Sequence, residues 1–162
     1  MPFGAVVALV LPEPAPDALE EATVQLFRIG YDRIAGTLAG GTDAWASSGG
    51  DLRSYPTTTV EALHADAIAG ANAYALDVRE PHEWRYEGVV PGAIQIPLGD
   101  LVDRLASIPR DAPVTVMCRS GHRASMAASL LDAAGIDVRL IARGGAPDWP
   151  ARDAATADVT PA

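Results

Sequence analysis

The sequence has few of the features that tie a protein to a disulfide framework, a polyanion or a membrane. Its 162 residues include one cysteine, Cys118, so no internal disulfide can form and the fold does not depend on an oxidising compartment. Lysine and arginine together number 12 against 21 acidic residues, a formal net charge of -9, and no basic stripe follows any helix-like segment. This balance argues against nucleic acid or an anionic lipid surface as a partner.

Long hydrophobic runs are also missing. The most apolar stretch, GAVVALVL at residues 4–11, is far shorter than the roughly 20 residues that a membrane span needs. It lacks a basic leader and is followed at once by prolines at 12, 14 and 16, which favours a buried strand over a secretory signal. We therefore expect no membrane partner and a cytoplasmic location.

Short apolar runs bounded by Pro, Gly or Asp predict buried strands. They occupy residues 5–11, 73–78, 92–97, 113–118 and 138–142. Helical patterns lie between them at residues 17–29, 59–66 and 123–134. This alternation predicts an α/β fold with a parallel sheet covered by helices on both faces, in which sites gather beyond the carboxyl ends of the strands.

The ends of the predicted helices carry local signals. Asp17 is a candidate cap for the first, Thr58 and Glu61 have the spacing of a capping box for the second, and Gly135 closes the third. A shorter helix is predicted to begin near Pro81, with Trp84 facing inward. Its glutamates Glu80, Glu83 and Glu87 are expected to form a solvated face.

Composition divides the chain. Residues 47–59, polar, glycine-rich and broken by proline, resemble a linker, and residues after Trp149 have no apolar periodicity. We predict a partial domain over residues 1–55 without an active-site loop, a complete domain over residues 56–150 and a flexible tail over residues 151–162.

An internal repeat relates the two parts. Residues 26–49 and 131–153 share five identities in the same order, pairing Gly30, Asp32, Gly40, Gly41 and Trp45 with Gly135, Asp137, Gly144, Gly145 and Trp149. The N-terminal segment therefore looks like the second half of the same unit. Where the second copy has CRSGHR, the first has PEPAPD, which cannot perform the same chemistry.

The second copy surrounds Cys118 with basic and titratable side chains. The segment MCRSGHRAS, residues 117–125, places Arg119, His122 and Arg123 between the end of a predicted strand and the start of a predicted helix. Backbone N–H groups at such a helix terminus, together with the arginines, favour an anion or a thiolate. A lone cysteine at a strand end is most often an inert core residue, but two arginines beside it favour a reactive thiol.

These residues resemble the rhodanese family of sulfurtransferases. LDVREPHEW (76–84), PGAIQIPL (91–98), VMCRSGHRAS (116–125) and ARGGAPDW (142–149) follow the family's order over residues 57–150. The resemblance implies a rhodanese-like parallel sheet and a persulfide carried on Cys118. Loop residues Arg119, Ser120, Gly121, His122 and Arg123 would bind the donor.

The resemblance also implies the partners and the supporting residues. The donor would be a small sulfur-containing anion such as thiosulfate or a persulfide, and the acceptor cyanide, a thiol or a protein. Asp77 and Arg79 would brace the loop, with a surface ion pair as the alternative. No cofactor is implied, and the spacing of His64, His82 and His122 suggests no metal.

Two other functions are compatible with the same residues. Phosphatases on a similar fold place the loop arginine six positions after the cysteine, whereas Arg123 follows Cys118 by five. Phosphate or arsenate chemistry is therefore the less favoured enzymatic function. The second is a docking or sulfur-relay module. An intact cysteine and cationic loop count against pure docking, but they do not separate free thiosulfate chemistry from relay between proteins.

The N-terminal segment has its own resemblance. RIGYDRIAGTLAGGTDAW, residues 28–45, is similar to the degenerate first rhodanese unit of proteins that fuse a metallo-β-lactamase-like hydrolase to rhodanese repeats. Half a parallel sheet leaves an open edge, so we expect residues 1–55 to pack on the second domain or to form a homodimer.

Overall fold

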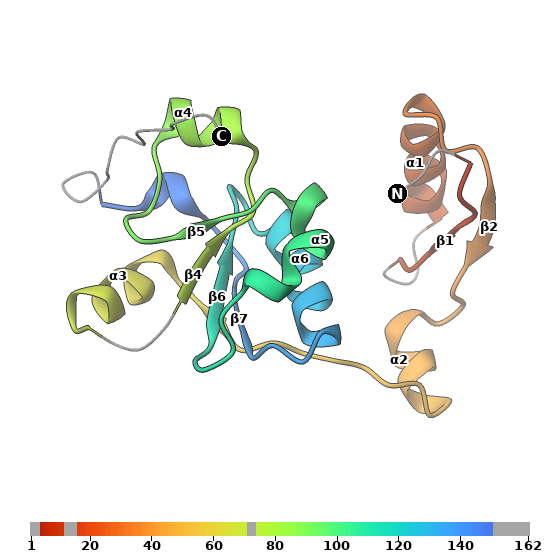
Figure 1. Cartoon of the computed structure of the whole chain (residues 1–162). Coiled ribbons are helices and arrows are strands. Elements are labelled where there is room, and N and C mark those ends of the chain that lie inside the picture. Colours follow the sequence, from red (N-terminus) through yellow and green to blue (C-terminus); the bar gives the residue numbers. More distant parts are fainter. Residues whose placement is uncertain (1–3, 12–15, 71–73, 151–162) are drawn as a thin grey trace. The chain divides into compact units, whose positions relative to one another are not determined.

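The computed structural model describes residues 4–11, 16–70 and 74–150, and the chain divides into two compact units, Met1–Ser54 and Tyr55–Ala162 (Figure 1). The tail predicted over residues 151–162 lies outside the described residues.

The second unit is built on a five-stranded sheet in the order β3-β7-β6-β4-β5. Its strands are β3 (Thr57–Thr58), β4 (Tyr74–Asp77), β5 (Ile94–Gln95), β6 (Val114–Met117) and β7 (Val138–Ile141). Every neighbouring pair is parallel, and Asp77 at the end of β4 stands beside Met117 at the end of β6. The predicted α/β fold is confirmed.

Helices cover both faces of this sheet (Figure 1). On one face lies α3 (Val60–Ile68); on the other lie α5 (Leu101–Arg104) and α6 (His122–Ala133). All four residues of β6 are buried, as expected for a central parallel strand. Short elements complete the unit: α4 (Pro81–Glu87), η1 (Leu98–Asp100), η2 (Leu105–Ser107) and η3 (Ala146–Asp148).

Each face has its own apolar cluster. The first joins alternate strand residues, such as Leu76, Val114 and Val116, to the alanines and Leu131 of α6. The second, on the α3 side, joins the strand residues Met117 and Ile141 to Leu63 of α3 and to Trp149. Cys118 belongs to the first cluster, in step with Val114 and Val116, because side chains alternate along a strand.

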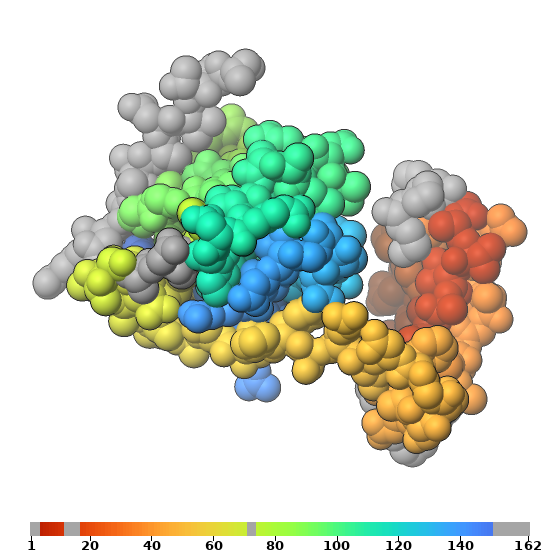
Figure 2. Space-filling view, turned by 60° about the horizontal axis from the view of Figure 1, so that its bottom comes forward, coloured from red at the N-terminus to blue at the C-terminus, as the bar shows by residue number. Residues whose placement is uncertain are grey.

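Figure 2 turns the amino ends of the strands toward the reader. There the segment near residue 110 lies against the segment near residue 135. The Arg110 guanidinium donates to the Ala134 carbonyl over 2.8 Å, which satisfies a carbonyl in the last turn of α6. The carboxyl ends of the parallel strands lie at the opposite edge of the sheet, where α4 also lies (Figure 1).

The first unit contains β1 (Val7–Leu9), α1 (Pro16–Arg28), β2 (Ile34–Thr37) and α2 (Gly41–Ser47), with β1 and β2 paired in parallel. Within its described residues, only Val7 and Gly41 are buried. Its exposed large apolar residues are Val6, Val10, Leu19, Val24, Phe27, Ile29, Trp45 and Leu52. A unit with so little buried apolar surface gains little stability from its own core.

Most predicted elements are present, with shifted ends. The helices predicted at 17–29 and 123–134 are α1 and α6, and Gly135 follows α6 with φ at 74°. The cap of α3 was predicted one residue too early: Thr59, not Thr58, accepts the Ala62 N–H through its hydroxyl over 3.2 Å. The segment predicted to be a linker, residues 47–59, contains β3. Thr57 and Thr58 pair with Leu140 and Ile141 of β7, and the Leu140 N–H donates to the Pro56 carbonyl.

Candidate active site

The centre of the site is Cys118, directly after β6. Its side chain is 1% exposed, and its Sγ accepts the Gly121 N–H over 3.1 Å. Gly121 has φ at 92°, a conformation that glycine adopts without strain, and α6 begins at the next residue. The thiol therefore lies in a tight loop at the amino end of a 12-residue helix, whose dipole favours negative charge.

The loop rests on the turn that follows β7. The Ala146 N–H donates to the Cys118 carbonyl over 2.9 Å. A Cβ added to Gly145 would lie 1.9 Å from that carbonyl oxygen, and one added to Gly121 would lie 2.1 Å from the Ala142 oxygen. Both positions therefore need glycine for close backbone approach, a role that the sequence alone did not reveal.

Arg123, in the first turn of α6, is bound by Glu83 of α4. The Glu83 carboxylate accepts from both terminal nitrogens of the guanidinium, over 2.5 and 2.7 Å, and also accepts the Glu80 N–H over 2.9 Å. The hydrogen bonds from Arg123 are the main reason why the pKa of Glu83 falls from 4.5 to about 2. The same contact raises the pKa of Arg123.

A second chain of charges starts in the core. Arg79 is fully buried beside Asp77, and its Nε and Nη2 donate to Asp77 Oδ2 over 3.0 and 2.8 Å. Its Nη1 reaches Glu87 Oε2 over 3.1 Å, and Nη2 also donates to the Gly88 carbonyl over 2.8 Å. The other Glu87 oxygen pairs with Arg119 of the loop. The surface ion pair considered for Asp77 and Arg79 is therefore wrong, because both side chains are 0% exposed.

The structure brings the expected site residues together. Ser120 Oγ lies 3.1 Å from Nδ1 of His122, and both residues are exposed on the loop beside Arg119. The loop residues adjoin Cys118 directly, whereas Asp77 and Arg79 connect to it through Glu87 and Arg119.

The glutamates of α4 are less exposed than the sequence predicted. Glu83 is buried at 9% exposure and Glu87 is partly buried, so these two residues do not form a solvated face. Trp84 is buried, as predicted. The four-residue spacing of Glu83 and Glu87 puts them on one side of a helix, but only the fold brings that side to the loop arginines.

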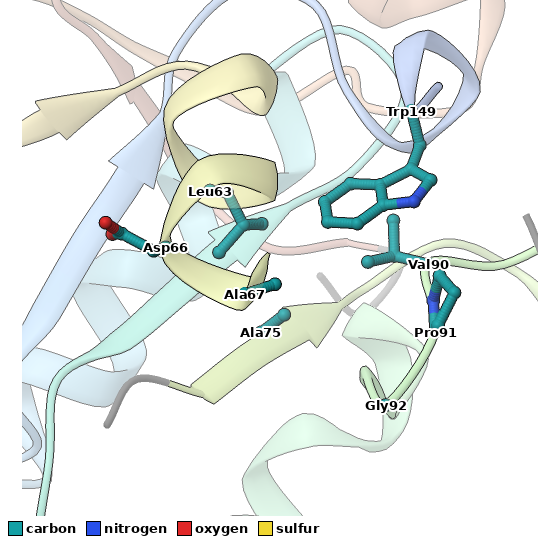
Figure 3. A pocket seen from close by; sticks show the side chains of 8 residues that line it. All are labelled: Leu63, Asp66, Ala67, Ala75, Val90, Pro91, Gly92 and Trp149. Carbon is teal, nitrogen blue, oxygen red and sulfur yellow. The ribbon is translucent and has the colours of Figure 1, made fainter. Parts of the chain in front are cut away.

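A separate pocket of about 200 Å³ lies on the α3 side of the sheet (Figure 3). Its wall includes Leu63 and Ala67 of α3, Val90 and Pro91 of the loop between α4 and β5, and Trp149. The Trp149 ring meets His64 edge-on with centroids 4.9 Å apart. None of residues 118–123 lines this pocket.

No group of three or more His, Cys, Asp or Glu side chains among the described residues is placed to hold a metal ion. No helix within the described ranges has the length and apolar character needed to cross a membrane.

Comparison with known proteins places this geometry in a family. The model of the rhodanese-like domain family matches residues 59–151 of this chain. A protein of Allochromatium vinosum named sulfurtransferase is 36% identical over 74 residues, which is 46% of this chain and 68% of that protein. YtwF of Bacillus subtilis, whose name assigns it provisionally to the sulfurtransferases, is 32% identical over 88 residues, 54% of this chain and 84% of that one.

The fold comparison agrees. The solution structure of the rhodanese-like domain from the Anabaena protein Alr3790 superposes with a TM-score of 0.54 and 28% sequence identity, covering 67% of this chain and 86% of that one. Strands β4 to β7, helices α3 to α6 and the cysteine loop fall within the segment that the family match covers, and the chain therefore belongs to the rhodanese-like domain family.

Proposed function

We propose that this protein is a sulfurtransferase that carries sulfane sulfur as a persulfide on Cys118. The observation that carries the proposal is the position of the Cys118 Sγ, which accepts the Gly121 N–H at the amino end of α6. A thiolate is the nucleophilic form of cysteine, and N–H donors with a helix terminus stabilise it. The family match and the name of the Allochromatium relative support sulfur transfer.

The reaction proceeds in two displacements. The Cys118 thiolate attacks the outer sulfur of thiosulfate, the S–S bond of the donor breaks, and sulfite leaves with the bonding pair, so that Cys118 carries a persulfide. The same attack on an organic persulfide releases a thiolate. Cyanide or a thiol then attacks the outer sulfur of the Cys118 persulfide and regenerates the thiolate, which makes the cycle ping-pong.

The remaining site residues have supporting roles in this proposal. The loop from Arg119 to Arg123, through Ser120, Gly121 and His122, surrounds the donor. Asp77 and Arg79 act as a buried brace, because Arg79 holds Glu87, which in turn pairs with Arg119. A site that depends on a free thiol is suited to a reducing compartment such as the cytoplasm.

The domains are proposed as residues 1–55, a partial degenerate rhodanese-like unit like that of the metallo-β-lactamase fusion proteins, and residues 56–150, the catalytic domain. The order β1-α1-β2-α2 parallels β6-α6-β7-η3, and both strand pairs are parallel, which supports a half-unit. Its exposed apolar residues support a homodimer through this segment. Sedimentation of the full chain over a range of concentrations tests it: a monomer throughout overturns the dimer.

The function is tested with purified protein, thiosulfate and cyanide, by following thiocyanate release and the mass of the protein. The wild type is expected to gain one sulfur atom and to release thiocyanate, and the Cys118→Ser variant to do neither. If the wild type forms no persulfide with thiosulfate or with cysteine persulfide, the proposal fails. Hydrolysis of a phosphate ester that depends on Cys118 would then favour phosphatase chemistry, and its absence would favour a docking role.

A further inference from the structure

Three arginines near Cys118, Arg79, Arg119 and Arg123, are engaged by carboxylates. Arg123 is bound by both oxygens of Glu83, over 2.5 and 2.7 Å. Arg119 pairs with one oxygen of Glu87, and Arg79 with the other oxygen and with Asp77. These three arginines and three carboxylates cancel in formal charge, so the cluster has no net positive charge to offer a donor.

Burial makes the cancellation effective. The Glu83 side chain is 11% exposed and the Arg123 side chain 30%, so water screens their contact less than it screens an exposed ion pair. The pKa of Glu83, lowered to about 2 mainly by Arg123, keeps this carboxylate charged at neutral pH. The whole chain has a formal charge of -9, so its overall field does not attract a dianion to the site.

Thiosulfate makes demands that such a cluster meets poorly. It is a dianion, and its leaving group, sulfite, is also doubly charged at neutral to alkaline pH. A sulfonate that binds Arg123 competes with the Glu83 carboxylate, which accepts from both terminal nitrogens. Arg119 is 60% exposed and pairs through Nη1 alone, so a sulfonate on its other donors would lie near the Glu87 carboxylate and be repelled by it. An organic persulfide carries no sulfonate group, and its outer sulfur needs only the N–H donors of the loop and the start of α6.

We propose that Glu83 and Glu87 set the donor preference of the site, so that Cys118 takes sulfur from a low-molecular-weight organic persulfide in preference to thiosulfate. This inference rests on the proposed function. In the preferred step the Cys118 thiolate bonds to the outer sulfur of the persulfide, the donor S–S bond breaks, and the donor's thiol sulfur leaves with the electron pair as a thiolate. The proton of a protonated donor stays on the transferred sulfur.

The test compares cysteine persulfide and thiosulfate as donors in the full chain, with mass spectrometry of Cys118 and steady-state kinetics. For the wild type we expect kcat/KM for the persulfide to exceed that for thiosulfate by about tenfold or more, and kcat/KM for thiosulfate to change less than about twofold with added salt. A wild type that prefers thiosulfate overturns the inference, whether or not any variant folds.

Two variants identify the responsible groups. Glu83→Gln and Glu87→Gln each remove one charge and keep an oxygen acceptor, and in the first of them the new amide oxygen can still accept the Glu80 N–H. For each folded variant we expect the KM for thiosulfate to fall on the order of tenfold, with kcat changed little, and the kinetics to become salt-sensitive. Because the persulfide has no sulfonate to bind, its kinetics should change less than those of thiosulfate, so that the ratio of the two kcat/KM values shifts toward thiosulfate.

The matched control is Asp66→Asn. It also removes one carboxylate, but its ion pair is with Arg139 over 3.6 Å, away from the loop. It should leave the donor ratio unchanged. If folded Glu83 and Glu87 variants also leave the ratio unchanged, the inference is overturned while the sulfurtransferase proposal stands. If Cys118 takes sulfur from neither donor, the proposed function itself fails.

Discussion

The buried pair of Asp77 and Arg79 makes a strong prediction about stability. Both side chains are 0% exposed, and the guanidinium donates to the carboxylate over distances of 2.8 to 3.1 Å. In Arg79→Met the Asp77 carboxylate stays buried and, of its contacts with that residue, keeps only the backbone N–H, at 3.1 Å. Leaving one charge of such a pair without its partner costs about 3–5 kcal/mol.

A loss of this size is large for a domain of ordinary stability, about 5–15 kcal/mol. We expect Arg79→Met to lower the free energy of unfolding by about 3–5 kcal/mol at pH 7, measured by urea denaturation of the full chain with fluorescence of the buried tryptophans Trp84 and Trp149. The double variant Asp77→Asn/Arg79→Met removes both charges and should regain most of the loss, since neither partner then remains charged and unpaired.

The chain offers a matched control at Asp51 and Arg53, which have the same spacing in the sequence. Their ion pair, at 3.1 Å, joins side chains that are 77% and 65% exposed. Arg53→Met should therefore cost less than about 0.5 kcal/mol. If Arg79→Met cost no more than Arg53→Met, or if the double variant were less stable than the single one, the reasoning from burial would be refuted.

Three further predictions concern the loop, its ion pair and a helix cap. Gly145→Ala should displace the Cys118 loop, lower kcat/KM for sulfur transfer by at least about tenfold and reduce stability by about 1–3 kcal/mol. The control Gly99→Ala, whose added Cβ meets nothing within 4 Å, should leave activity unchanged. Equal activities of the two variants would contradict the close contact at Gly145. The pKa of Glu83 is lowered from 4.5 to about 2 in the folded protein. The stabilisation that its carboxylate provides is therefore complete above its pKa in the unfolded chain and is lost as pH falls from 4.5 toward 2. The stability difference between wild type and Glu83→Gln, at most about 3 kcal/mol, should shrink over that range in urea titrations, and a constant difference would count against the assignment. Thr59→Ala should cost about 1 kcal/mol in thermal or urea unfolding, because it removes the N-cap acceptor of α3, and an unchanged stability would show that the cap is not formed.

The sequence located the secondary structure well where local patterns specify it. The apolar run before Cys118 and the helical pattern after it predicted β6 and α6 within a residue or two, since each depends on neighbouring positions. Weaker signals were missed: β2 contains Ala35 and Gly36, and β3 consists of two threonines whose pairing with β7 is a long-range contact. Propensity over so few residues does not predict a strand.

By itself, the sequence therefore determined a parallel α/β domain and a single cysteine placed between a buried strand and a helix. Only the tertiary structure decided what surrounds that cysteine. Glu83 meets Arg123 across 40 residues and Glu87 meets Arg119 across 32, because the parallel pairing of β4 with β6 brings the segments after both strands to the same edge of the sheet. The charge of the site depends on these long-range contacts, which no local periodicity encodes.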